Sequence, residues 1–110
     1  MIDWTRVRQL QDEVGAEDFD EVIDLFLEEV GTAIARLEVL QDRSKLGDDL
    51  HFLKGSALSL GFKEFSDLCH DGETTSANGC PDSVDVTALI ECYHSSKGVF
   101  LAEYEHKLVA

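Results

Sequence analysis

Residues 46–61 read LGDDLHFLKGSALSLG and have the hydrophobic spacing of an amphipathic helix. At roughly 100° per residue, the apolar side chains form a single stripe, which consists of Leu46, Leu50, Leu53, Ala57 and Leu60. His51 lies on the opposite face, together with Lys54, Gly55 and Leu58. We therefore expect an exposed imidazole with a cation one turn further on, no side chain beside it, and an exposed leucine nearby.

This face has the parts for nucleophilic attack on a phosphoryl group. A neutral imidazole nitrogen is available at physiological pH, because an unperturbed histidine has a pKa of about 6.5. Lys54 is placed to bring its ammonium close to a phosphoryl oxygen. Gly55 costs a helix about 1 kcal/mol relative to alanine, and clearance for an approaching active site would explain that cost. Each residue alone also fits an ordinary surface position, but their combination favours phosphoryl transfer.

The same stretch resembles the histidine-containing phosphotransfer (HPt) domains of multistep phosphorelays, whose motif is approximately His-x-x-Lys-Gly-Ser followed by a second glycine. The matching residues are His51, Lys54, Gly55, Ser56 and Gly61. This resemblance implies a small antiparallel helical bundle with His51 as the phosphoacceptor. It also implies receiver domains and a hybrid or sensor histidine kinase as partners, with Mg²⁺ bound by the receiver and no cofactor bound by this chain. Phe62 follows the second glycine, where the family often has a small residue.

Composition and hydrophobic spacing predict a single all-α domain over residues 1–110. The chain has 110 residues, 44% of them hydrophobic, and a single proline, and it shows no strict alternation of apolar and polar residues. Five helical segments are expected: from an Asp3 cap to near Gly15, from Glu17 or Asp18 to about Leu40, from a Ser44 cap to about Leu60, from Phe62 to about Thr74, and from a Ser83 or Asp85 cap through Leu108. Residues 72–82 have the composition of a loop. These segments predict an antiparallel up-down four-helix bundle with a short extra N-terminal helix.

Charge narrows the class of partner. The net charge of −14 excludes a nucleic-acid backbone as the natural ligand and disfavours an anionic membrane. Residues 43–63 are the exception, since they contain four basic and two acidic residues. We expect them to attract the acidic catalytic pocket of a receiver domain, with Leu58, Phe62, Lys45 and Lys63 as the partner-binding residues. Alternatively, Arg43 and Lys45 complement the C-terminal dipole of the preceding helix.

The sequence predicts no metal site and no catalytic machinery beyond His51. Cys69, Cys80 and Cys92 form no Cys-x-x-Cys pair, which argues against a disulfide framework and against a zinc site built on Cys69 and His70. No glycine-rich phosphate loop is present, so we expect a phosphocarrier without ATP-dependent kinase activity of its own. With no signal-like N-terminus and no long apolar run, we expect a cytoplasmic monomer.

Two functions of different class remain open. In the first, His51 accepts a phosphoryl group from a receiver-domain aspartyl phosphate and passes it to another receiver. In the second, the chain is a non-catalytic acidic helical adaptor that binds receiver or kinase domains. A phosphoacceptor domain of the chemotaxis-kinase type is a variant of the first, ranked lower because no kinase domain follows within the sequence. Replacement of His51 separates the two classes, because only the first requires the imidazole.

Overall fold

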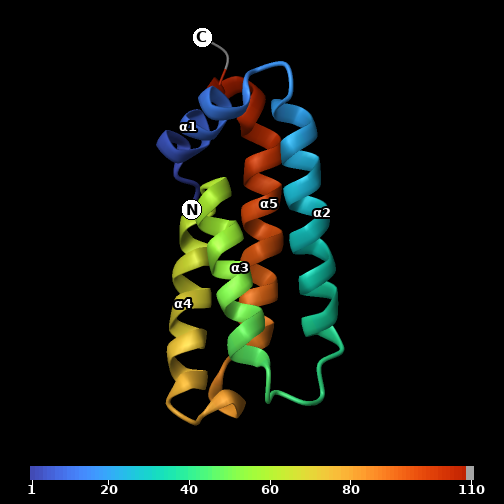
Figure 1. Cartoon of the computed structure of the whole chain (residues 1–110), viewed down its shortest axis with the longest axis vertical. Coiled ribbons are helices and arrows are strands. Elements are labelled where there is room, and N and C mark those ends of the chain that lie inside the picture. The colour runs from blue at the N-terminus through green and yellow to red at the C-terminus, as the bar shows by residue number, and fades with distance from the viewer. Residues whose placement is uncertain (109–110) are drawn as a thin grey trace.

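The computed structural model describes residues 1–108, apart from the side chains of residues 105, 107 and 108, so the expected contribution of Leu108 and the end of the expected domain lie outside the described residues. The elements are α1 (Trp4–Val14), α2 (Phe19–Glu38), α3 (Leu46–Leu60), α4 (Lys63–Ala77), the short 3-10 helix η1 (Pro81–Ser83) and α5 (Val86–Leu108). Helices α2 to α5 run antiparallel along the long axis, and α1 lies across one end (Figure 1). The described residues contain no strand. The predicted all-α four-helix bundle with an extra N-terminal helix is confirmed.

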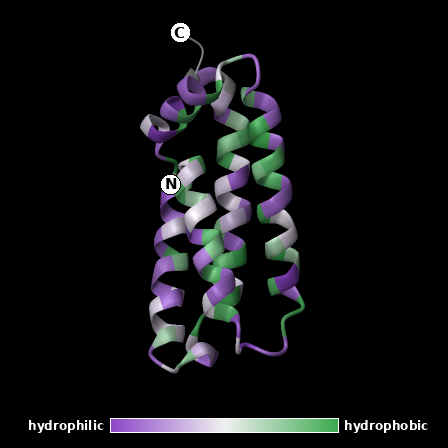
Figure 2. Ribbon diagram, viewed as in Figure 1, coloured by the Kyte–Doolittle hydropathy of each residue, from purple (hydrophilic) through white to green (hydrophobic). Residues whose placement is uncertain are grey.

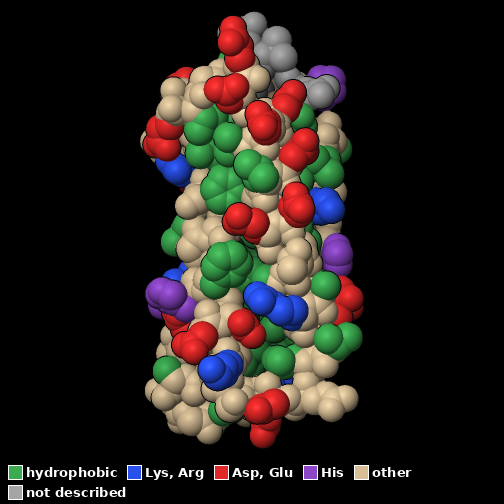
Figure 3. Space-filling model, turned by 45° about the vertical axis from the view of Figure 1, so that its right-hand side comes forward, with side chains coloured by type: hydrophobic (Ala, Val, Ile, Leu, Met, Phe, Trp, Pro, Cys, Tyr) green, Lys and Arg blue, Asp and Glu red, His purple; other side chains and the backbone are tan. Residues whose placement is uncertain are grey.

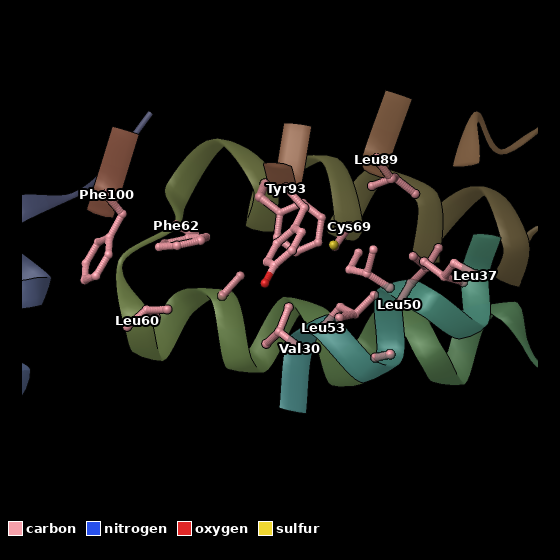
Figure 4. Close-up of a cluster of buried hydrophobic side chains, with 14 of the residues drawn as sticks. Val30, Leu37, Leu50, Leu53, Leu60, Phe62, Cys69, Leu89, Tyr93 and Phe100 are labelled. Atoms are coloured by element: carbon pink, nitrogen blue, oxygen red, sulfur yellow. The ribbon is translucent and has the colours of Figure 1, made fainter. Parts of the chain in front are cut away.

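All five α-helices contribute apolar side chains to one core. The α3 stripe predicted from the sequence is buried, each of its members being 0–3% exposed. Aromatic rings from α4, α5 and the turn before α4 fill the middle of the bundle, as Figure 4 shows for Phe62, Tyr93 and Phe100. No helix of the described residues has the length and apolar character needed to span a bilayer.

Two of the predicted helix caps are confirmed, and one is wrong. The Asp3 carboxylate accepts a hydrogen bond from the backbone N–H of Arg6 at 3.2 Å, and Asp85 accepts one from Ala88 at 3.0 Å. Ser44 does not cap α3. Its backbone N–H instead donates to Asp42 at 2.9 Å, within the loop that precedes the helix, and Lys45 takes the cap position.

The turn between α3 and α4 requires the glycine at position 61. Gly61 has φ +86°, and the backbone N–H of Phe62 closes the turn on the carbonyl of Ala57 at 2.9 Å. The left-handed conformation costs little for glycine and is unfavourable for residues with a Cβ. A Cβ here would also lie 2.8 Å from the carbonyl oxygen of Asp3. The predicted stop of α3 at Gly61 is therefore confirmed, and the same glycine lets the start of α1 pack on the turn.

The predicted loop over residues 72–82 is wrong in its first half, because α4 continues to Ala77. The sequence of this helix is mostly hydrophilic (Figure 2), so the spacing of its apolar residues does not mark where it ends. Packing accounts for the extension. Gly72 is buried inside α4, and a Cβ at this position would lie 2.8 Å from Leu50 Cδ1 of α3. The glycine thus allows α3 and α4 to approach closely, and the next residue, Glu73, is carried to the side of α3 that bears His51.

Candidate functional site

His51 lies near the middle of α3, and its side chain is 73% exposed. The apolar stripe on the other side of α3 packs into the core, so the ring is held at the surface by the packing of the helix itself. The predicted exposure of this imidazole is confirmed.

One carboxylate, which the sequence analysis did not identify, binds both polar residues of this face. Glu73 Oε2 lies 2.8 Å from His51 Nδ1, and Glu73 Oε1 lies 2.6 Å from Lys54 Nζ. The side chains of Glu73 and Lys54 are only 20% and 21% exposed. Lys54 is therefore not a free surface cation; it holds Glu73 in place beside the imidazole.

The charge state of Glu73 determines which nitrogen of the neutral His51 ring carries the proton. The hydrogen bond from Lys54 holds the pKa of Glu73 below its ordinary value; partial burial opposes this shift, and the hydrogen bond from His51 reinforces it. An ionised carboxylate only accepts hydrogen bonds, so the proton of the neutral ring lies on Nδ1. Nε2 is then the nitrogen with a free electron pair. The arrangement leaves an oriented ring nitrogen without a proton at the surface.

Gly55 leaves the space beside the imidazole open. A Cβ built on this residue would meet no heavy atom within 4 Å, other than those of its own helix backbone and chain neighbours. Among the described residues, no packing contact therefore accounts for a glycine here. The role of this residue in giving clearance to an approaching protein stays a prediction.

The predicted partner-binding residues divide into three exposed positions and one buried one. Leu58 is 54% exposed, and Lys45 and Lys63 are also exposed. Phe62 as a docking residue is wrong: its side chain is 2% exposed, and its ring packs against that of Phe100 with centroids 5.5 Å apart (Figure 4). The left-handed turn at Gly61 takes residue 62 off the helical wheel of α3 and points its side chain into the core.

Two further exposed hydrophobic side chains, one of them adjacent to His51 in sequence, were not predicted. Phe52, directly after His51, is 43% exposed, and Leu25 of α2 is 54% exposed. Both line a groove of about 350 Å³ between α2 and α3, here called the α2–α3 groove, which is lined by Leu25, Glu28, Glu29, Thr32, Arg36 and Phe52. A signal for Phe52 existed in the sequence, because it lies roughly 100° around the helix from His51 and outside the buried stripe.

The basic residues of segment 43–63 are less available than their number suggests. Arg43 donates hydrogen bonds to the carbonyls of Pro81 at 3.1 Å and Val84 at 2.9 Å. It therefore anchors the loop around η1, which neither of the expectations for this residue included. With Lys54 bound to Glu73, and Lys63 3.7 Å from Asp67, little free positive charge surrounds the imidazole.

Side chains that could ligate a metal are dispersed in the part of the chain that the structure describes. No group of three or more histidine, cysteine, aspartate or glutamate side chains is arranged to hold an ion there. Cys69 is buried, which raises the pKa of its thiol to about 12, and Cys80 is exposed.

Comparison with known proteins gives one match. The family model described as the Hpt domain matches residues 21–98, well over half of the chain, with His51 inside the matched range. The comparisons with curated proteins and with solved structures found no match. All of α1, the first two residues of α2 and the part of α5 after residue 98 lie outside the matched residues.

Proposed function

The chain belongs to the Hpt domain family, which carries out histidine phosphotransfer in two-component signalling, and from this premise we propose that His51 is its phosphoacceptor. His51 takes a phosphoryl group from the aspartyl phosphate of one receiver domain and gives it to the aspartate of another. The hydrogen bond between His51 Nδ1 and Glu73 is the observation that carries this proposal, because it leaves Nε2 unprotonated on an exposed ring.

The transfer requires no proton to move to or from any residue of this protein. The electron pair of His51 Nε2 forms the N–P bond while the P–O bond to the receiver's aspartate breaks, and the aspartate leaves as a carboxylate. The ring keeps its proton on Nδ1 and becomes positively charged, which Glu73 at 2.8 Å stabilises. In the second half, the carboxylate of another receiver attacks phosphorus, the N–P bond breaks, and the neutral ring returns.

The partner supplies the remaining catalytic groups. Phosphoryl transfer depends mainly on positioning and on neutralising charge at the phosphoryl oxygens. Mg²⁺ and the acidic pocket of the receiver would provide the metal and the acceptor or leaving carboxylate. His51, Lys54 and Glu73 provide the oriented nucleophile, and Gly55 provides space for the approach.

A two-step transfer assay tests the function. Receiver domains from the same genome, phosphorylated with labelled phosphate, are mixed with this protein, and an unlabelled receiver is added afterwards. We expect label to move to His51 and then to the second receiver. Stable binding of a phosphorylated receiver without movement of label would instead support the non-catalytic adaptor.

Removal of the Glu73 carboxylate should slow transfer by about 10- to 100-fold, the range typical of carboxylates that orient a metal-binding histidine. Glu73→Ala frees the ring to rotate and to exchange its proton between the two nitrogens. Nitrogen chemical shifts of the imidazole measure this directly: the wild type should show protonated Nδ1, and the variant a mixture of both tautomers. Asp71→Ala, which removes an exposed carboxylate two residues away on α4, is the matched control.

Lys54 should act through the same carboxylate. Lys54→Ala should slow transfer and also shift the tautomer mixture, whereas Lys54→Arg, which keeps the positive charge near Glu73, should slow transfer less. Unchanged tautomers in Glu73→Ala would contradict the orienting role. Unchanged transfer in both Lys54 variants would leave that residue without a part in the reaction.

A further inference from the structure

We propose that the α2–α3 groove selects the partner of His51, and that it favours receiver domains whose contacting surface combines an apolar side chain with lysine or arginine residues. This inference rests on the proposed phosphotransfer function. It concerns which receivers dock, and it is carried by the exposed hydrophobic side chains, the charge and the position of the groove.

One wall of the groove is formed by the residue that follows the reactive histidine on α3. Phe52 follows His51 on α3, and its exposed ring forms one wall, while Leu25 of α2 forms part of the other. Leu58, two turns along α3 from His51, is also 54% exposed, but it is not among the residues that line the groove. Exposed apolar side chains that share one groove, as Phe52 and Leu25 do, are typical of protein interaction sites. Because Phe52 is adjacent to His51 on α3, we expect a receiver that reaches Nε2 to cover this end of the groove.

The α2 side of the groove is strongly acidic. Glu28 and Glu29 line it and are exposed. Residues 12–29 contain nine acidic residues and no lysine or arginine, and Figure 3 shows hydrophobic side chains on this face interspersed with acidic ones. Arg36 is the basic residue among those that line the groove. The apolar side chains of the groove, Phe52 and Leu25, are thus bordered by the carboxylates of Glu28 and Glu29.

This charge pattern determines which occupant fits. A second copy of the chain, with a net charge of −14, would bring carboxylates against carboxylates, and an anionic membrane would be repelled for the same reason. A receiver with basic side chains around an apolar one would be attracted by Glu28 and Glu29, while its acidic catalytic pocket faces His51. Opposite charges at an interface raise the association rate and fix orientation, whereas like charges exclude wrong partners.

Paired charge reversals test the proposal. Glu28→Lys/Glu29→Lys changes the groove, and Glu91→Lys/Glu103→Lys makes the same change in net charge at exposed positions of α5. We expect the groove variant to lose at least about 10-fold in the rate of transfer from a cognate phosphorylated receiver, and its rate to depend less on ionic strength. The α5 variant should lose far less. Leu25→Ser should also slow transfer, with Leu101→Ser, an exposed leucine of α5, as its control.

A readout without any receiver separates this proposal from the proposed function. Phosphoramidate, a small phosphoryl donor, should label His51 equally in the wild type and in all four variants. Equal transfer rates in the groove and α5 variants, or faster transfer after reversal of Glu28 and Glu29, would overturn the groove proposal while leaving His51 as the phosphoacceptor. A wild type that accepts no phosphoryl group from any receiver would overturn both. Mutation of basic residues on the receiver to glutamate should restore transfer to the Glu28→Lys/Glu29→Lys variant.

Discussion

His51→Gln should abolish transfer of phosphate from a phosphorylated receiver to this protein. The electron pair of the glutamine amide nitrogen is delocalised into the carbonyl group, so the nitrogen is not nucleophilic and no N–P bond forms. The polar end of the glutamine side chain still reaches the neighbourhood of Glu73. Because the His51 side chain is 73% exposed, the free energy of unfolding should change by only about 0.5 kcal/mol. The label in the wild type should be acid-labile and base-stable, as expected of a phosphoramidate, and should map to His51.

His94 provides a matched control for this experiment. Its side chain is 57% exposed, and its Nε2 lies 3.7 Å from Glu38, so it is also an exposed imidazole near a carboxylate. It has no lysine bound to that carboxylate among the described residues. His94→Gln should therefore transfer phosphate at the wild-type rate. Full labelling of His51→Gln, or label at His70, His94 or His106, would contradict the assignment of His51.

The helices could be predicted because their determinants are local. The spacing of apolar residues in α3 set both its extent and the exposed face of His51, and Asp3, Asp85 and Gly61 marked helix ends through short-range hydrogen bonds and backbone conformation. The length of α4 could not be read in the same way. Its last turns are polar in sequence and are held by close packing of Gly72 on Leu50, a contact between helices that no local pattern reveals.

Only part of the site could be predicted from the sequence, because the rest depends on how two helices pack. His51, Lys54 and Gly55 share one helix, so their relation followed from the helical period. Glu73 comes from another helix, 22 residues further along the chain, and its position depends on how α3 and α4 pack. Glu73 belongs to the site but was not predicted, whereas Phe62 was predicted as a docking residue but is buried. Its proximity in sequence to Leu58 suggested a shared surface, but the turn at Gly61 separates a buried side chain from an exposed one.

A bulky residue at position 55 should block transfer without unfolding the protein. Gly55→Leu fills the open space beside the imidazole and holds the receiver's phosphoryl group away from Nε2. Because a displacement of about 1 Å can cost 100-fold in a positioned reaction, we expect at least that loss. Phosphoramidate, which is small, should still label His51 in this variant.

Gly98 is the matched control, since it is also an exposed helical glycine at which a Cβ would meet nothing within 4 Å. Gly98→Leu should transfer phosphate normally. Alanine at either position should raise the free energy of unfolding by up to about 1 kcal/mol, because it favours the helix and meets no neighbour. Substitutions at Gly55 should thus affect the transfer rate and the free energy of unfolding differently. The glycine makes α3 less stable but lets a receiver reach His51. Normal transfer by Gly55→Leu, or thermal destabilisation by Gly55→Ala but not by Gly98→Ala, would show instead that Gly55 serves packing rather than approach.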